Sequence, residues 1–183
     1  MLLGAALALL PPNRTAAPPS SAIVVATRDL PPGAVLSAAD VGVRGVPPGL
    51  VPSGALVRAG DATGQSLAAA VRAGEPLTDV RLLGPAETRL TSGDSDAVAV
   101  AVRLADPAVA ELLHPGSRVD VVTAGDGQAA AGVLATDATV LMVRAGPSGT
   151  GDQGRLVVLA VRRDAATGVA AAGLHDPVAV TLR

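Results

Sequence analysis

Short apolar runs separated by proline and glycine turns constrain the fold of this chain most strongly, and they are clearest between residues 23 and 83. The run Ile23–Ala26 precedes Pro31–Gly33, where proline fixes φ and glycine adopts backbone conformations that other residues resist. Ser37 can cap a single helical turn, after which Val41–Val46 alternates with the period of a half-buried strand. The pattern predicts a compact all-β module with tight turns.

The kinds of residue that are missing exclude several functions. Hydrophobic residues make up 49% of the 183 residues but none is aromatic, so the chain offers no stacking platform for single-stranded nucleic acid or sugar rings. All 14 basic residues are arginines and the net charge is -2, which excludes lysine chemistry and gives no field that attracts nucleic acid. The lack of cysteine excludes thiolate nucleophiles, disulfides and the usual zinc sites.

The N-terminal residues 1–10 form an apolar segment that is too short to cross a membrane alone. Its nine residues Leu2–Leu10 would span roughly 14 Å as a helix, against a hydrocarbon core of about 30 Å. No basic residue precedes the segment, which a secretory signal would require. We interpret it as a residual membrane-anchor segment, with a disordered apolar tail as the alternative. Residues 11–21 are a Pro/Ala-rich spacer.

A polar, turn-rich linker is predicted at residues 84–96, and the sequence after it alternates between strand and helix patterns. Ala97–Leu104 has the alternation of a strand with one packed face, and Asp106 and Pro107 are typical of a helix start. This helix carries an apolar stripe at Val109, Leu112 and Leu113. It is predicted to end at Pro115-Gly116, because proline and glycine stop a helix.

The remaining pattern continues in the same way. Further strands are predicted at Arg118–Thr123, Ala129–Ala135, Thr139–Val143 and Leu156–Val161. Asp164 can cap a final helix reaching about Leu174, and Val178–Leu182 alternates as a closing strand. Residues 97–183 are therefore predicted to form a small α+β domain.

Several residues of the first module resemble a known family. They are Val24 to Gly33, Leu36, Asp40, Val41, Gly64 and Ala73 to Leu77. In sequence and order they resemble the SAF domain, a β-clip module named from antifreeze proteins, sialic acid synthases and flagellar P-ring chaperones. The resemblance implies a SAF β-clip domain at residues 22–83.

The second half adds to this resemblance. The run Leu113 to Val122, the strand Ala138 to Leu141 and the ending Val180 to Arg183 are similar to the RcpC/CpaB domain. A SAF module followed by that domain is the arrangement of the Flp pilus assembly protein CpaB family. That family has a full N-terminal membrane helix, of which this chain holds only the short segment before Pro11.

Two motifs could indicate a cofactor or metal site. Gly149 to Gly154 spells the dinucleotide pattern G-x-G-x-x-G, but that motif needs a following helix and here a predicted strand follows. We interpret it as a hairpin loop. Asp94 and Asp96 could form a paired carboxylate or a weak calcium site, although carboxylates in a Gly/Ser-rich linker are usually solvated.

Histidines and arginines supply the other candidates. His114 and His175 each lie at the end of a predicted helix, where a histidine commonly meets the last carbonyls. No Gly-x-Ser-x-Gly elbow suggests a Ser-His-Asp site. Four arginines could line a groove for an anionic sugar, with a solubilising role as the commoner alternative: Arg28, Arg44, Arg58 and Arg72.

The sequence thus predicts a mainly β chain with short helices, a SAF β-clip domain followed by a small α+β domain. We expect a bacterial, non-enzymatic, extracytoplasmic assembly factor of a Flp/Tad-type pilus, anchored in the cell membrane by an N-terminal helix. Its expected partners are other pilus assembly or secretion components, with a homo-oligomer left open and nucleic acid excluded. No catalytic, cofactor or metal site is predicted, and exposed strand edges or loops would bind. The alternative is a SAF-type carbohydrate-binding module at the cell wall. A synthase or lyase fragment is disfavoured, because such proteins keep their catalytic machinery in another domain.

Overall fold

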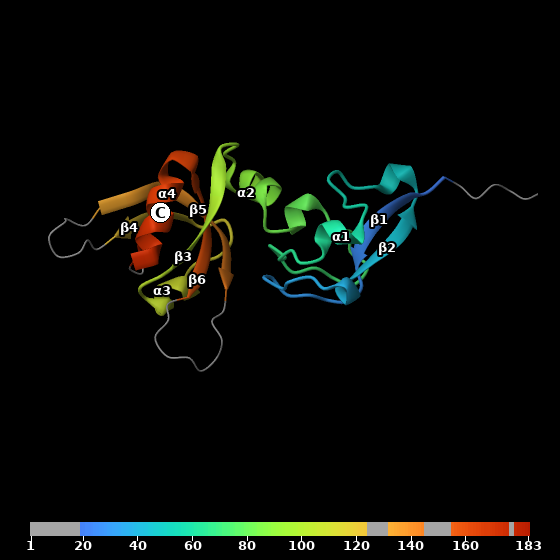
Figure 1. The fold of residues 1–183 in the computed structure, drawn as a ribbon, viewed down its shortest axis with the longest axis horizontal. Helices are drawn as coiled ribbons and strands as arrows, with labels where there is room; N and C mark the ends of the chain where they lie inside the picture. Colours follow the sequence, from blue (N-terminus) through green and yellow to red (C-terminus); the bar gives the residue numbers. More distant parts are fainter. Residues whose placement is uncertain (1–18, 124–131, 145–154, 176–177) are drawn as a thin grey trace, which may run out of the picture.

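A computed structural model describes residues 19–123, 132–144, 155–175 and 178–183 of the chain. They form two lobes, and helix α2 (Pro85–Ser92) lies between them (Figure 1). We call residues 21–83 the N-terminal lobe and residues 97–183 the C-terminal lobe. The predicted anchor and spacer lie almost wholly outside the described residues. The prediction of a mainly β chain with short helices is confirmed.

The N-terminal lobe is built around a two-stranded antiparallel sheet. Strands β1 (Ser21–Ala26) and β2 (Val41–Val46) pair along their whole length, and the single helical turn η1 (Ala38–Asp40) directly precedes β2, as predicted. The other edge of β1 also has partners, since Leu77 N–H donates to the carbonyl of Val24 at 2.8 Å. Short elements complete the lobe: η2 (Pro48–Leu50), α1 (Ala59–Ala62) and η3 (Asp79–Arg81).

Small aliphatic residues fill the core of this lobe, as expected without aromatics. Its buried members are Val24, Ala26, Leu30, Leu36, Val41, Ala62, Leu67, Val71, Leu77 and Leu82. Around this core, isolated backbone bridges connect the loops, such as Leu30 with Val71 and Val35 with Ser66. The lobe therefore has little regular sheet and many backbone contacts between loops.

The C-terminal lobe is a five-stranded sheet in the order β3-β6-β5-β4-β7. The strands are β3 (Ala97–Arg103), β4 (Arg118–Thr123), β5 (Gly132–Arg144), β6 (Leu156–Arg162) and β7 (Ala179–Leu182). Each neighbouring pair in this order is antiparallel. A parallel bridge between Leu104 and Val178 then joins the two outer strands at one end, so the sheet curls toward closure.

The two faces of this sheet bury different side chains. One face carries the large cluster that includes Val102, Val140 and Leu159, together with residues of α3 (Pro107–Glu111) and α4 (Arg163–His175). The other face carries Ala97, Leu141, Met142, Val158 and Ala160, against which Leu83 of the N-terminal lobe packs. This second cluster is where the lobes meet.

Two sequence predictions in the C-terminal lobe need correction. The separate strands predicted at 129–135 and 139–143 are one strand, β5, within the described residues. Asp137 interrupts its pairing with a left-handed φ of 56°, a conformation that aspartate tolerates better than most residues. The helix predicted to run up to Pro115 is also shorter than expected, because α3 ends at Glu111. Leu112 and Leu113 follow it, and Leu113 is buried whereas Leu112 is 62% exposed.

The segment predicted as a turn-rich linker contains the helix α2 (Pro85–Ser92). Pro85 occupies its first turn, and Gly93 ends it with a left-handed φ of 72° while donating its N–H to the carbonyl of Arg89 at 3.0 Å. The helix buries polar residues, Glu87, Thr88 and Ser92, and leaves Leu90 67% exposed. Its polar composition therefore does not mark a solvated linker. No helix among the described ranges is long and apolar enough to span a membrane.

Glu87 is buried, and one of its carboxylate oxygens has no hydrogen-bond partner among the described residues. Thr91 Oγ1 donates to its Oε1 at 2.9 Å, while no hydrogen bond is seen for Oε2. Burial raises the pKa of Glu87, and the bond from Thr91 opposes this shift only in part. The folded state therefore holds this proton more tightly than the unfolded chain does. Ionisation of Glu87 consequently destabilises the fold as pH rises above the ordinary value for glutamate.

We expect Glu87→Gln to raise the free energy of unfolding at pH 7 by about 1 kcal/mol, because it removes the buried charge and keeps the shape. The difference should shrink toward zero below about pH 4, where the wild-type carboxyl is protonated in both states. Chemical denaturation followed by far-UV circular dichroism measures both values. A gain that is the same at both pH values would contradict the electrostatic explanation.

Candidate functional site

Asp29 joins two turns of the N-terminal lobe that are far apart in sequence. Its Oδ1 accepts the N–H of Ala73 at 2.9 Å, and its Oδ2 pairs with the Arg72 guanidinium. These two interactions, the backbone one first, hold the pKa of Asp29 below its usual value. The carboxylate therefore acts as an ionised acceptor that fixes one turn against the other.

The carboxylate of Asp40 also fixes a turn, directly before β2. Its Oδ2 accepts from the Ser37 hydroxyl at 2.7 Å and from the Ser37 N–H at 3.0 Å, and its Oδ1 pairs with Arg28 Nε at 2.7 Å. The bonds from Ser37, followed by Arg28, hold the pKa of Asp40 below its usual value. Asp40 is only 5% exposed, so its lone pairs are satisfied where water has little access.

Glu75 closes the third turn of this kind. Its Oε2 accepts the N–H of Arg72 at 3.0 Å, and its Oε1 pairs with Arg81 at 2.8 Å. The charged residues that recur in the resemblance therefore hold turns in place. They are not arranged as a nucleophile and a base.

A hollow of about 570 Å³ opens on the N-terminal lobe where these turns meet the sheet. It is lined by Val25, Ala26, Thr27, Gly42, Val43, Arg44, Ala73 and Gly74. Two of the lining residues are glycines, so backbone atoms form much of its wall. Arg44 is the cationic residue of this lining, and no ion pair of its side chain is seen in the part of the chain that the structure describes. The hollow could accept a flat or extended polar ligand.

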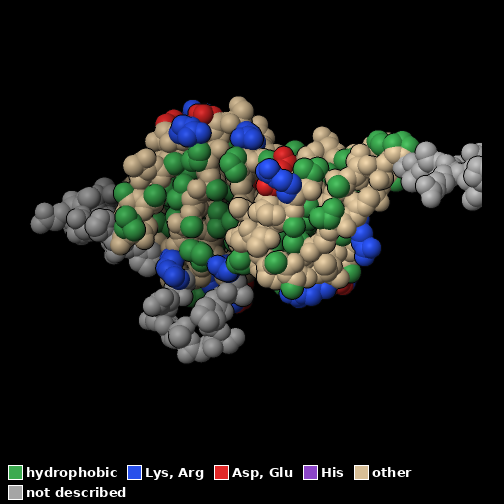
Figure 2. All heavy atoms as spheres, turned by 45° about the vertical axis from the view of Figure 1, so that its right-hand side comes forward, with side chains coloured by type: hydrophobic (Ala, Val, Ile, Leu, Met, Phe, Trp, Pro, Cys, Tyr) green, Lys and Arg blue, Asp and Glu red, His purple; other side chains and the backbone are tan. Residues whose placement is uncertain are grey.

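The structure does not bring the four arginines together in one groove. Arg28, Arg58 and Arg72 pair with Asp40, Asp61 and Asp29, respectively. On the face that Figure 2 shows, arginines are dispersed over both lobes. Of these four arginines, Arg44 alone lines the hollow described above.

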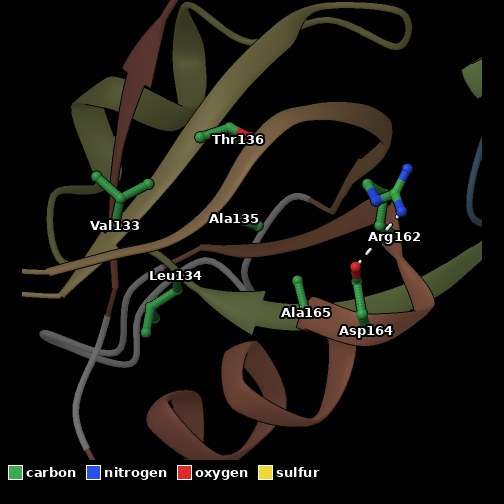
Figure 3. A pocket seen from close by; sticks show the side chains of 7 residues that line it. All are labelled: Val133, Leu134, Ala135, Thr136, Arg162, Asp164 and Ala165. Atoms are coloured by element: carbon green, nitrogen blue, oxygen red, sulfur yellow. Dashed lines mark hydrogen bonds and ion pairs between the residues drawn. The ribbon is translucent and has the colours of Figure 1, made fainter.

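A second hollow, of about 420 Å³, lies on the C-terminal lobe (Figure 3). It is lined by Val133, Leu134, Ala135, Thr136, Arg162, Asp164 and Ala165. The pair of Arg162 and Asp164, 3.4 Å apart, lies at one end, and Val133 and Leu134 lie at the other. The hydrogen bond to Asp164 raises the pKa of Arg162. This lining offers one ion pair, one hydroxyl and alkyl groups, which suits binding better than acid–base chemistry.

A network of charges ties three neighbouring strands of the C-terminal lobe. Asp120 of β4 accepts the N–H of Asp137 at 2.8 Å and pairs with Arg183 at 2.9 Å, while Asp137 pairs with Arg118 at 2.8 Å. The Asp137 N–H, more than Arg183, holds the pKa of Asp120 below its usual value. The network fixes the irregular part of β5, where Asp137 has its left-handed backbone.

The other candidates from sequence are not brought together. His114 is exposed in a turn beyond α3, where its N–H donates to Ser117 Oγ at 3.0 Å, and His175 is the last residue of α4. Asp94 accepts the N–H of Asp96 at 2.8 Å, and Asp96 pairs with Arg163 at 3.3 Å. No group of three or more metal-ligating side chains occurs in the described ranges. The run 149–154 lies outside those ranges.

The turns held by Asp29, Asp40 and Glu75 all belong to the N-terminal lobe. Comparison with known families gives a match over the same residues as this lobe. Residues 21–83 match the family model of the SAF domain. The N-terminal lobe is a SAF domain. Its resemblance residues Asp29, Asp40 and Glu75 are the turn-holding carboxylates described above. No curated protein and no solved structure matches the chain.

Proposed function

We propose that the chain is a non-enzymatic, extracytoplasmic assembly factor of a Flp/Tad-type pilus, similar to the CpaB family. One observation carries this proposal beyond the SAF domain. Three separate stretches of the C-terminal lobe resemble the RcpC/CpaB domain, and they occupy the neighbouring strands β5, β4 and β7. Val119, for example, pairs with Ala138 on one side and with Leu182 on the other. The resemblance thus falls on one contiguous sheet region.

The mechanism would be binding and positioning of another pilus component. The SAF domain and the C-terminal lobe present exposed strand edges and two hollows, which suit protein contacts. An N-terminal anchor would keep both lobes at the outer side of the cell membrane. The test is deletion of the gene in the bacterium that encodes it, followed by immunoblotting of sheared surface pilin. Unchanged pilin on the surface would reject the proposal.

A double variant, His114→Ala with His175→Ala, should leave surface pilin unchanged. Histidine is the commonest general acid or base near neutral pH, and this chain has only two. The same immunoblot measures the outcome, and thermal unfolding of the purified variant verifies its fold. A variant that is fully folded yet fails to assemble pili would contradict the non-enzymatic assignment.

A carbohydrate-binding function is the second candidate, and Arg44 beside the hollow of the SAF domain favours it. A guanidinium without an intramolecular ion pair can bind the carboxylate of an anionic sugar. Calorimetric titration with sialic acid and with soluble peptidoglycan fragments tests this candidate. Arg44→Ala should abolish binding, whereas Arg58→Ala, which changes an arginine paired with Asp61, should not. Absence of binding by the wild-type chain would reject the candidate.

A further inference from the structure

The outer edge of β2 carries backbone groups that find no partner within the described residues. Thr27 N–H donates to the carbonyl of Asp40 at 2.9 Å, and antiparallel pairs alternate, so Gly42 and Arg44 direct their backbone groups toward β1. Val43 and Gly45 therefore direct theirs away from it. No hydrogen bond to these outward groups is seen within the described residues. Figure 1 places β2 on the side of the SAF domain away from the C-terminal lobe.

This edge also lacks the features that normally prevent strand pairing. β2 has no proline and no lysine, and its one charge is Arg44. Val43 is 54% exposed, and Gly42 and Gly45 add no side chains of their own to β2. The short elements α1 and η1 contact β2, whereas the outer edge of β3 is bridged at its end by Val178 and contacts the longer helices α2 and α4. β2 is therefore open to a further strand.

We propose that β2 pairs with β2 of a second copy of this chain, antiparallel about a two-fold axis, with Val43 of one copy opposite Val43 of the other. In this register the outward groups of Val43 exchange two hydrogen bonds, and those of Gly45 face Val41 of the other copy. Each Arg44 lies opposite Gly42, which has no side chain to obstruct it. The exposed valines bury one another.

Two neighbouring registers of the β2–β2 pair should be less stable than this one. Moving the axis onto Arg44 places the two guanidinium groups directly opposite each other, and like charges in that position destabilise a sheet. Moving it onto Gly42 leaves Gly45 without a partner in β2 of the other copy, so fewer outward groups form hydrogen bonds. The charge and the glycine spacing of β2 thus fit one self-pairing register. We therefore choose a second copy as the occupant of this edge.

Cysteine cross-linking tests the register, because the natural chain has no cysteine. Under mild oxidation the full chain carrying Val43→Cys should form a disulfide-linked dimer, since opposed residues of such a pair lie about 5.5 Å apart between Cα atoms. Val35→Cys is the matched control, because Val35 has the same 54% exposure outside β2, and it should form no disulfide-linked dimer. Cross-linking of Arg44→Cys in preference to Val43→Cys would overturn the register.

Sedimentation equilibrium tests the association itself. The full chain should dimerise between about 10 μM and about 1 mM, since one short strand pair gives a weak interface. Val43→Lys should weaken the dimer at least about tenfold by opposing two charges, whereas Val35→Lys should not. Equal thermal unfolding of both variants excludes misfolding. A wild-type chain that stays monomeric throughout this range would overturn the proposal, and neither assay depends on the proposed pilus function.

Discussion

Leu159→Ala is expected to lower the free energy of unfolding of the C-terminal lobe by about 3 kcal/mol and to leave the SAF domain unchanged. Leu159 has no exposed surface and lies in the large cluster of its own lobe. The matched change, Leu77→Ala, removes an equally buried leucine from the core of the SAF domain and should have the reverse selectivity. Among the described residues the lobes share only the smaller cluster around Leu141, so each should unfold largely on its own.

Hydrogen exchange measured by mass spectrometry resolves this prediction, because peptides report each lobe separately. Intrinsic fluorescence is no substitute, since the chain contains no tryptophan or tyrosine. Faster exchange should be confined to the lobe that carries the substitution. If either variant accelerated exchange equally in both lobes, the chain would have one cooperative core, and the division at residues 84–96 would be wrong.

Gly74→Val is the second substitution with a large expected effect. Gly74 has a φ of 83°, and its N–H donates to the carbonyl of Ala26 at 2.8 Å, which fixes the turn against β1. A side chain there would meet no atom within 4 Å, so the cost comes from the backbone conformation alone. We expect a loss of about 2 kcal/mol in the stability of the SAF domain, because β-branched residues strongly disfavour positive φ.

Gly49→Val is the control for this substitution. A Cβ atom at Gly49 would also meet open space, and the φ of Gly49 lies outside the left-handed region. The valine should therefore change stability much less at this position, as measured by thermal unfolding of each variant. Equal losses at Gly49 and Gly74 would show that the added side chain, and not the left-handed backbone, is responsible.

Much of the fold follows from local patterns in the sequence. The strand over Val41–Val46 and the buried run of β6 are predicted correctly because alternation and continuous apolar runs reflect burial directly. Asp106 and Pro107 predict the start of α3 correctly, and Asp106 Oδ1 accepts the N–H of Ala108 at 2.8 Å. These features depend on neighbours within a few residues, so sequence alone contains their causes.

Other features depend on contacts that local patterns do not contain. The polar composition of α2 predicts a linker, yet tertiary packing buries Glu87 and Thr88. Pro85 and Gly93 are the start and stop signals by which sequence could have indicated this helix. The continuity of β5 across Asp137 depends on the carboxylate of Asp120, which lies in another strand. Such a long-range bond has no signature in the residues that surround Asp137.

The candidate sites illustrate the same limit. The sequence groups four arginines by their occurrence in one module, but whether an arginine faces a ligand or an aspartate depends on the fold. Three of them have aspartate partners, and two of these partners are distant in sequence, as with Arg72 and Asp29. The hollow beside Arg44 forms from backbone segments brought together by turns, so composition could not predict it.

The bridge between Leu104 and Val178 constrains the order in which the two lobes can fold during synthesis. The SAF domain makes its contacts among residues that are synthesised early, so it can fold while the ribosome is still extending the chain. The C-terminal sheet cannot curl closed until the segment around Val178 has emerged, because that segment joins the far edge at Leu104. If the chain is exported as it is made, the C-terminal sheet therefore closes after the SAF domain has already reached the far side.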